Sequence, residues 1–242
     1  MRKFALLFCC TVIMAACDKH DPILPGIRTE IFDTGKNQNI LNIPVPDLPE
    51  SVPTQDVTDC PYTIDKTNTI YDGDRKIFVG FPAPNSMDVE TKPVCGGGYV
   101  YAGLNTGSVV KVAPATRRVI WMADVYSESN MMGGAATVDI VAPLVLDGSY
   151  VYVGGMGDSF CKINVSNGAK KWCVSVGTRH QFIVLNNVAY VVGLDSALYA
   201  IRLTDGSIYW RTDLSHMDTP KYQDKIITVH RKKYDASTGA EI

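Results

Sequence analysis

The stretch AYVVGLDSALYAIRLTDGSIYW, residues 189–210, is one of three in this chain that end on a tryptophan in the same register. The others are VYAGLNTGSVVKVAPATRRVIW at residues 100–121 and VYVGGMGDSFCKINVSNGAKKW at residues 151–172. The three align without a gap, and each has a tyrosine 20 residues before its tryptophan. The tryptophans are Trp121, Trp172 and Trp210, and the tyrosines are Tyr101, Tyr152 and Tyr190. A register kept over three copies indicates an internal structural repeat.

Each copy has the pattern of short β-strands joined by tight turns. Its apolar runs are rich in β-branched and aromatic residues, and Gly, Asn and Asp separate them. Asp147-Gly148 and Asn186-Asn187 supply residues that tolerate the positive φ of a hairpin turn, and Asn167-Gly168 and Asp205-Gly206 mark a second turn. We therefore expect about four antiparallel strands in each copy, and no helix beyond the N-terminal segment.

A four-stranded repeat of this length cannot bury both of its faces alone, and radial packing of the copies is the common solution. We predict an all-β fold, a β-propeller of four-stranded antiparallel blades, with three to four recognisable blades in residues 66–242. Between the first two copies the chain carries an additional loop, SESNMMGGAATVD at 127–139. Long loops on a rigid β scaffold often bind partners, although an irregular surface loop is the commoner explanation.

The chain ends on KYDASTGAEI, residues 233–242, which has the form of a further repeat turn. If a tryptophan followed Ile242, Asp235 would lie 8 residues before it, Thr238 would lie 5 before it and Gly239 would lie 4 before it. We therefore expect the chain to be an N-terminal part of a longer propeller, with an incomplete ring.

The repeat resembles the pyrroloquinoline-quinone-type propeller motif, Ala-x-Asp-x-x-x-Gly-x-x-x-Trp. The third copy matches this motif at Ala200, Gly206 and Trp210, and the second copy matches it in part. The first copy departs from it, with Arg117 in the glycine position. The resemblance covers about residues 94–242 and implies that the tryptophans have a structural role, packing between neighbouring blades.

The first residues, MRKFALLFCCTVIMAAC, have a basic start and a short apolar run. The run is shorter than the roughly 20 residues that a membrane-spanning helix needs, so we predict a signal peptide at 1–16. Residues 14–17 resemble a bacterial lipobox, which implies acylation of Cys17; an incidental cysteine after an ordinary signal is the alternative. The proline-rich residues 17–65 are expected to form an extended, lipid-anchored tether with a short strand at 38–43.

Together, the repeat and the lipobox resemble the propeller lipoprotein family of the outer-membrane β-barrel assembly machinery. This resemblance implies a non-catalytic scaffold without a cofactor, whose partners are the barrel-forming insertase and unfolded outer-membrane proteins. It also implies a periplasm-facing lipoprotein of the outer membrane, although Asp18 resembles a signal for retention in the inner membrane. The net charge of −2 gives no indication of a nucleic-acid partner.

Two other functional classes stay open. A quinoprotein dehydrogenase would use similar repeats to hold a quinone and a calcium ion, which needs converging oxygen ligands. However, Asp158, Asp195 and Asp205 fall at turns, where aspartate usually accepts hydrogen bonds from the backbone. The histidines show no paired spacing typical of a metal site. The third alternative is a remnant without a stable fold.

Four cysteines remain beyond the signal and the anchor: Cys60, Cys95, Cys161 and Cys173. Disulfides form in the oxidising compartment that a signal peptide implies. If Ser166-Asn167-Gly168 forms a three-residue hairpin loop, Cys161 faces Cys173 across the strands, close enough for a disulfide. Two reduced cysteines packed as small hydrophobic residues are the alternative.

Overall fold

The computed structural model describes residues 38–51, 60–84, 86–87, 91–126 and 137–242 of the chain. The predicted signal peptide, Cys17 and most of the 127–139 loop lie outside the described residues. Within these ranges the structure consists of eighteen β-strands without a helix, and no helix is therefore long and apolar enough to cross a membrane.

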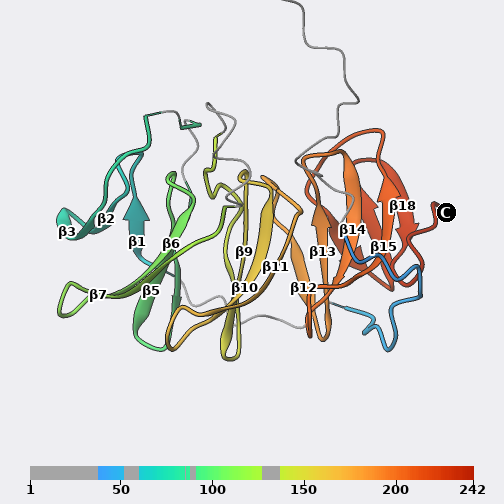
Figure 1. The fold of residues 1–242 in the computed structure, drawn as a ribbon, viewed down its shortest axis with the longest axis horizontal. Helices are drawn as coiled ribbons and strands as arrows, with labels where there is room; N and C mark the ends of the chain where they lie inside the picture. Colours follow the sequence, from blue (N-terminus) through green and yellow to red (C-terminus); the bar gives the residue numbers. More distant parts are fainter. Residues whose placement is uncertain (1–37, 52–59, 85, 88–90, 127–136) are drawn as a thin grey trace, which may run out of the picture. The chain divides into compact units, whose positions relative to one another are not determined.

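The strands form five antiparallel sheets that follow one another in chain order (Figure 1). Three of these sheets have four strands each and are the three repeats found in the sequence. The second sheet contains β4 (Val94–Gly96), β5 (Tyr99–Gly103), β6 (Ser108–Ala113) and β7 (Arg118–Asp124). The third contains β8 (Val145–Asp147), β9 (Tyr150–Gly155), β10 (Ser159–Asn164) and β11 (Lys170–Val174). The fourth contains β12 (Ile183–Leu185), β13 (Val188–Val192), β14 (Ala197–Arg202) and β15 (Ile208–Asp213).

The first and the last sheets have three strands each. The first contains β1 (Tyr62–Ile64), β2 (Thr69–Asp72) and β3 (Arg75–Val79). It was not recognised in the sequence because it has no tryptophan in the repeat register, and it begins four residues before the expected start of the propeller at residue 66. The fifth contains β16 (Lys221–Gln223), β17 (Ile226–Val229) and β18 (Lys232–Asp235), and corresponds to the partial fourth copy.

Part of the expected tether lies against the sheets instead of extending freely. Residues 38–50 run beside β15 and the last sheet (Figure 1). Asn39 and Leu41 exchange backbone hydrogen bonds with Ile208, and Val45 N donates to Ser237 O at 2.8 Å. The strand expected at 38–43 is a single parallel bridge between Ile40 and Ile208.

Each repeat tryptophan packs on a glycine of the next sheet. A Cβ atom on Gly168 would lie 2.8 Å from the ring of Trp121, and one on Gly206 would lie 2.9 Å from the ring of Trp172. Such distances are shorter than van der Waals contact allows, so only a hydrogen at this position lets the ring approach. The glycines also have positive φ, 73° at Gly168 and 79° at Gly206, which other residues rarely adopt. Each hairpin turn therefore provides a flat backbone surface for the preceding tryptophan.

The glycine contact predicts a difference between two Gly→Ala substitutions. Gly206→Ala should lower the free energy of unfolding by about 2–4 kcal/mol, because it adds a clash with Trp172 to the cost of a positive φ. Gly148→Ala is the matched control, since Gly148 has a φ of 54° and open space around the new methyl group. This control should cost only about 1–2 kcal/mol. Urea denaturation of both variants measures the difference, and equal costs would show that Trp172 does not need this glycine.

Candidate functional site

The repeat tryptophan and a lysine of the second sheet contact the third sheet. In the second sheet, the indole Nε1 of Trp121 donates to the carbonyl oxygen of Val165 in the third sheet at 3.0 Å. Lys111, the cross-strand neighbour of Trp121, donates to the same oxygen at 2.8 Å and lies over the ring of Tyr99 at 3.9 Å. Burial lowers the pKa of the Lys111 ammonium. Trp121 and Lys111 therefore have a structural role, since both side chains hold the second sheet against the third.

The next interface repeats this arrangement. Trp172 Nε1 donates to the carbonyl oxygen of Leu203 at 3.1 Å, and Lys162 Nζ donates to it at 2.8 Å. Lys162 Nζ also lies 4.0 Å from the centre of the Tyr150 ring. A cation over an aromatic face in a partly buried position is worth about 0.5–2 kcal/mol. The resemblance to the quinone-type motif did not indicate this lysine, although its position is the same in both copies.

The third interface differs because Ala200 stands where the other copies have lysine. The carbonyl oxygen of Ala236 now accepts a hydrogen bond from the hydroxyl of Tyr190 at 2.8 Å. Within the described part of the chain, the buried Nε1 of Trp210 has no hydrogen-bond partner. Burial raises the pKa of the Tyr190 hydroxyl well above its usual value.

The two interfaces predict a difference between two Trp→Phe substitutions. Trp172→Phe removes a hydrogen bond to Leu203, whereas Trp210→Phe removes a buried N–H that has no acceptor. Because a lost hydrogen bond costs about 1 kcal/mol, Trp172→Phe should lower the free energy of unfolding by about 1 kcal/mol more than Trp210→Phe. Denaturant titrations of the two variants provide the measurement. A larger loss for Trp210→Phe would contradict this assignment.

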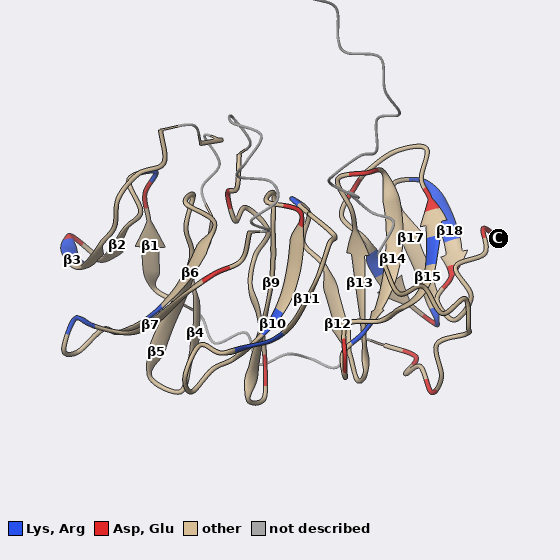
Figure 2. Ribbon diagram, viewed as in Figure 1, with Lys and Arg blue, Asp and Glu red and all other residues tan. Residues whose placement is uncertain are grey.

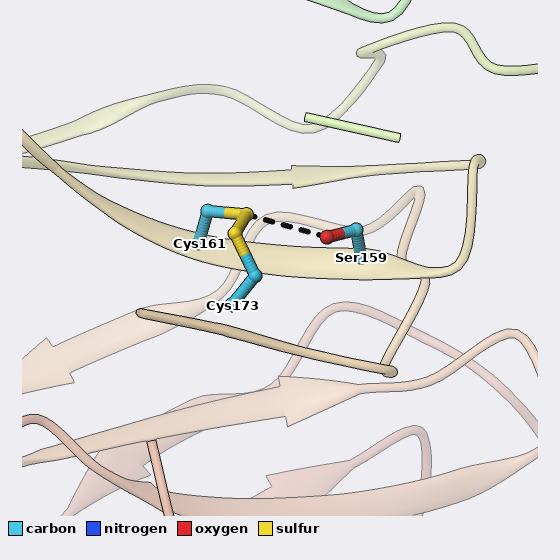
Figure 3. Close-up of a disulfide and its surroundings, with 3 residues drawn as sticks. All are labelled: Ser159, Cys161 and Cys173. Carbon is cyan, nitrogen blue, oxygen red and sulfur yellow. Dashed lines mark hydrogen bonds between the residues drawn. A yellow bond between two sulfur atoms is a disulfide. The ribbon is translucent and has the colours of Figure 1, made fainter. Parts of the chain in front are cut away.

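The four described cysteines form two disulfides in the structure. Cys161 on β10 lies opposite Cys173 on β11, and their sulfur atoms are joined (Figure 3). Ser159 lies on the same strand, with its hydroxyl 3.2 Å from the Cys161 sulfur. Cys60 and Cys95 form the second disulfide, across 35 residues. The second pairing could not be read from the sequence, because no hairpin relates the two cysteines.

Mass analysis tests both disulfides. The intact mass of the protein is measured before and after reduction, without alkylation. Reduction should increase the mass by about 4 Da, roughly 2 Da for each disulfide bond. A Cys161→Ser variant should show only half of this gain. No change on reduction would mean that all four thiols are free in the isolated protein.

The end of the 127–139 loop places a carboxylate inside the fold. Asp139 is 1% exposed, and one of its oxygens, Oδ2, accepts a hydrogen bond from the Met87 amide at 2.6 Å. Among the described residues, the other oxygen has no partner. Burial raises the pKa of this carboxyl group, and the hydrogen bond from Met87 opposes the rise. A small polar depression beside it is lined by Asn68, Asn105 and Thr91.

Asp139 predicts a pH dependence of stability. A carboxyl group whose pKa is higher in the folded state stabilises the fold only while it is protonated, below about 3.8, and this contribution is lost as the pH rises through the folded-state pKa. The stability of Asp139→Asn relative to the original chain should therefore rise as the pH increases above about 4. Thermal unfolding at several pH values measures this, with the exposed Asp74→Asn as control. A constant difference across this pH range would contradict the prediction.

The other acidic residues named in the sequence lie at turns. Asp158 accepts a hydrogen bond from the Gly177 amide at 3.3 Å, and Asp205 accepts one from the Ser207 amide at 3.1 Å. Asp205 also pairs with Arg202, whose guanidinium holds the pKa of the carboxyl group well below its usual value. Asp195 accepts from the Tyr199 hydroxyl at 2.6 Å. Asp158 and Asp195 line one pocket together with Gln38 and Tyr199, whereas Asp205 lies outside it.

Although the histidines show no paired spacing in the sequence, two of them lie side by side in the structure. The rings of His216 and His230 stack with centroids 5.2 Å apart, and His230 Nδ1 lies 3.7 Å from Asp218. In the part of the chain that the structure describes, no group of three or more His, Cys, Asp or Glu residues has an arrangement that could hold a metal ion. The described residues thus offer no carboxylate cluster for the calcium ion that a dehydrogenase of this fold would hold.

The remaining surfaces are the outer edges of the sheets. β7, β11 and β15 are the last strands of their sheets, and residues 39–43 cover the outer side of β15. Such an edge offers backbone N–H and C=O groups that can pair with another extended segment. What the geometry provides is therefore a rigid row of sheets with strand edges and turns as binding surfaces.

Comparison with known proteins places the chain among propellers. Residues 82–212 match the family model described as outer membrane protein assembly factor BamB. No curated protein matches the sequence. The structure of BamB from Moraxella catarrhalis is similar, with 14% identity and a TM-score of 0.58, over 75% of this chain and 56% of that one. The chain thus spans little more than half the length of that relative.

A second similar structure is the quinohemoprotein alcohol dehydrogenase ADHIIG from Pseudomonas putida HK5. It is 15% identical, with a TM-score of 0.50, over 65% of this chain and 34% of that one. At such low identities, both structural likenesses show the fold alone.

The sheets and their repeated tryptophan contacts define a β-propeller of the pyrroloquinoline-quinone-repeat type, and the predicted all-β fold class is confirmed. The family model covers more than half of the chain. The chain belongs to the family of outer membrane protein assembly factor BamB.

Proposed function

We propose that this chain is a non-catalytic scaffold that binds protein partners during the assembly and insertion of outer-membrane β-barrel proteins. The observation that carries the proposal is the match of residues 82–212 to the family of outer membrane protein assembly factor BamB. The structure supports a binding role, since its repeat side chains are occupied in contacts between sheets. Its strand edges and turns are the surfaces that remain for a partner.

The proposed partners are the barrel-forming insertase and its unfolded outer-membrane protein clients. Strands of β-barrel proteins alternate apolar and polar residues, and before insertion they have unpaired backbone groups. A sheet edge can pair with such a segment through main-chain hydrogen bonds, which need no particular side chain. A scaffold that accepts many clients would benefit from this kind of contact.

We place the protein in the cell envelope, facing the periplasm and held by a lipid on Cys17. Within the proposed tether, residues 38–50 pack on the sheets. The outer membrane is the proposed location, and the inner membrane is the alternative that Asp18 suggests. We also propose that the protein functions without a cofactor.

A pull-down tests the proposed function. The full chain with a C-terminal affinity tag is expressed in its own cells, and the envelopes are solubilised in mild detergent. The proposal predicts recovery of the barrel insertase, identified by mass spectrometry, and a weaker recovery with Cys17→Ala, which removes the lipid. Recovery of only unrelated inner-membrane proteins would contradict it, and so would dye-linked alcohol oxidation by the chain after incubation with quinone and calcium.

A further inference from the structure

The three four-stranded sheets allow their outer edges to be compared position by position. Each edge strand contains the repeat tryptophan, so the residues two before, one before and one after it correspond between copies. On β7 these residues are Val119, Ile120 and Met122. On β11 they are Lys170, Lys171 and Cys173. On β15 they are Ile208, Tyr209 and Arg211.

The edge of β15 has two apolar residues before its tryptophan, Ile208 and Tyr209, and residues 39–43 cover them. Ile208 donates its amide to Asn39 O at 2.9 Å and accepts from the Leu41 amide at 2.8 Å. The added segment runs parallel to β15, with a bridge between Ile40 and Ile208. As a result, Ile208 is fully buried and Tyr209 is 3% exposed. The chain therefore contains an example of an extended segment added to the outer edge of a blade.

The edge of β11 is protected in a different way. Lys170 and Lys171 are exposed, and lysine on an edge strand disfavours pairing with another strand, because its charge would be brought out of water. The third residue, Cys173, is linked to Cys161 on β10. An incoming strand would meet two ammonium groups at the positions where β15 presents isoleucine and tyrosine.

The edge of β7 has neither protection. Its corresponding residues are large, apolar and exposed: Val119 by 44%, Ile120 by 42% and Met122 by 50%. Among the described residues, β7 is the last strand of its sheet, and no isolated bridge forms on it. An exposed apolar edge strand is a liability for a soluble domain, and natural proteins usually cover or charge it. Its exposure here indicates a surface that a partner covers.

Charges at the two ends of β7 indicate how a partner would lie. Figure 2 shows basic residues where the strand begins, with Arg117 exposed in the preceding turn and Arg118 exposed as the first residue of β7, and an acidic residue, Asp124, at its end. A segment parallel to β7, as residues 39–43 are to β15, would place its N-terminal end beside the arginines. Opposite charges at such positions favour one orientation over the other.

We propose that the outer edge of β7 binds an extended segment of another polypeptide as an additional parallel strand. The segment has apolar residues facing Val119, Ile120 and Met122, an acidic residue at its N-terminal end and a basic residue at its C-terminal end. Its source is an unpaired strand of an unfolded β-barrel protein, because such strands have both apolar residues and unpaired backbone groups before insertion. The choice of source rests on the proposed function.

A peptide-binding experiment tests the site. The probe is a fluorescein-labelled peptide with the sequence QNILNI of residues 38–43, extended by two aspartates at its N-terminus and two lysines at its C-terminus. We expect the full chain to bind it, and the double variant Val119→Lys/Ile120→Lys to bind it at least about tenfold more weakly, a change of roughly 1.4 kcal/mol. The two lysines are those that β11 carries at the same positions, so the sheet should accept them.

Three controls make the outcome decisive. Phe81→Lys replaces another exposed apolar residue, 86% exposed, on a segment outside β7, and should leave binding within about twofold. A peptide with its aspartates and lysines exchanged should bind several-fold more weakly at low salt. If circular dichroism shows that the double variant does not fold, Met122→Lys provides an independent disruption of the same edge. Equal binding by the original chain and the folded variants, or no binding to the original chain, would overturn the proposal.

A second experiment tests the β7 site and the proposed function separately. The full chain and the double variant are each mixed with a purified outer-membrane β-barrel protein diluted from urea, and complex formation is measured by size-exclusion chromatography. We expect a complex with the original chain and little or none with the variant. Equal complex formation by both would overturn the β7 site while leaving the proposed function standing. Peptide binding at β7 without any client complex would instead count against the proposed function, and would overturn the choice of an unfolded barrel strand as occupant.

Discussion

The contact of a tryptophan ring with a glycine turn in the next sheet is the interaction on which this structure depends. It recurs at Trp121 on Gly168, Trp172 on Gly206 and Trp210 on Gly239, and thus joins four consecutive sheets. A ring of this size buries a large apolar area, and it can approach the backbone only where no Cβ atom intervenes. Because each copy supplies a ring at one side and a glycine at the other, identical units can follow one another without a separate connector.

The same contact decides which surfaces stay available for function. The inner residues of the blades are used for packing, and in the second and third sheets the indole N–H and the neighbouring lysine both donate to a carbonyl of the next sheet. The surface that remains available is the outermost strand of each sheet, and its three copies differ. One edge is covered by residues 39–43, one carries lysines and one is apolar and exposed. The binding site proposed on β7 follows from this difference between otherwise equivalent positions.

The parts of the fold that sequence reasoning predicted are those governed by local patterns. The tryptophan register, the alternating strands and the Gly turns appear within single hairpins. The predicted pairing of Cys161 with Cys173 is correct, but the predicted three-residue loop is wrong. Asn164 pairs with Ala169 around four loop residues, and a register shift between Lys162 and Ile163 brings the two cysteines opposite each other. The first sheet was missed because β3 ends at Val79 with no tryptophan to align. The docking of residues 38–50 was missed too, since proline-rich segments have no period and their contacts are with residues far along the chain. The Cys60–Cys95 bond is non-local in the same sense.

The central claim is that the edges of β15 and β7 are equivalent in register but only the first is covered. Amide hydrogen exchange of the free chain, resolved at Ile208 and at Val119, tests it most directly. The amide of Ile208 donates to Asn39, so it should exchange slowly, whereas the amide at the same register position of β7, that of Val119, should exchange rapidly. Slow exchange at both amides, or rapid exchange at Ile208, would contradict this account.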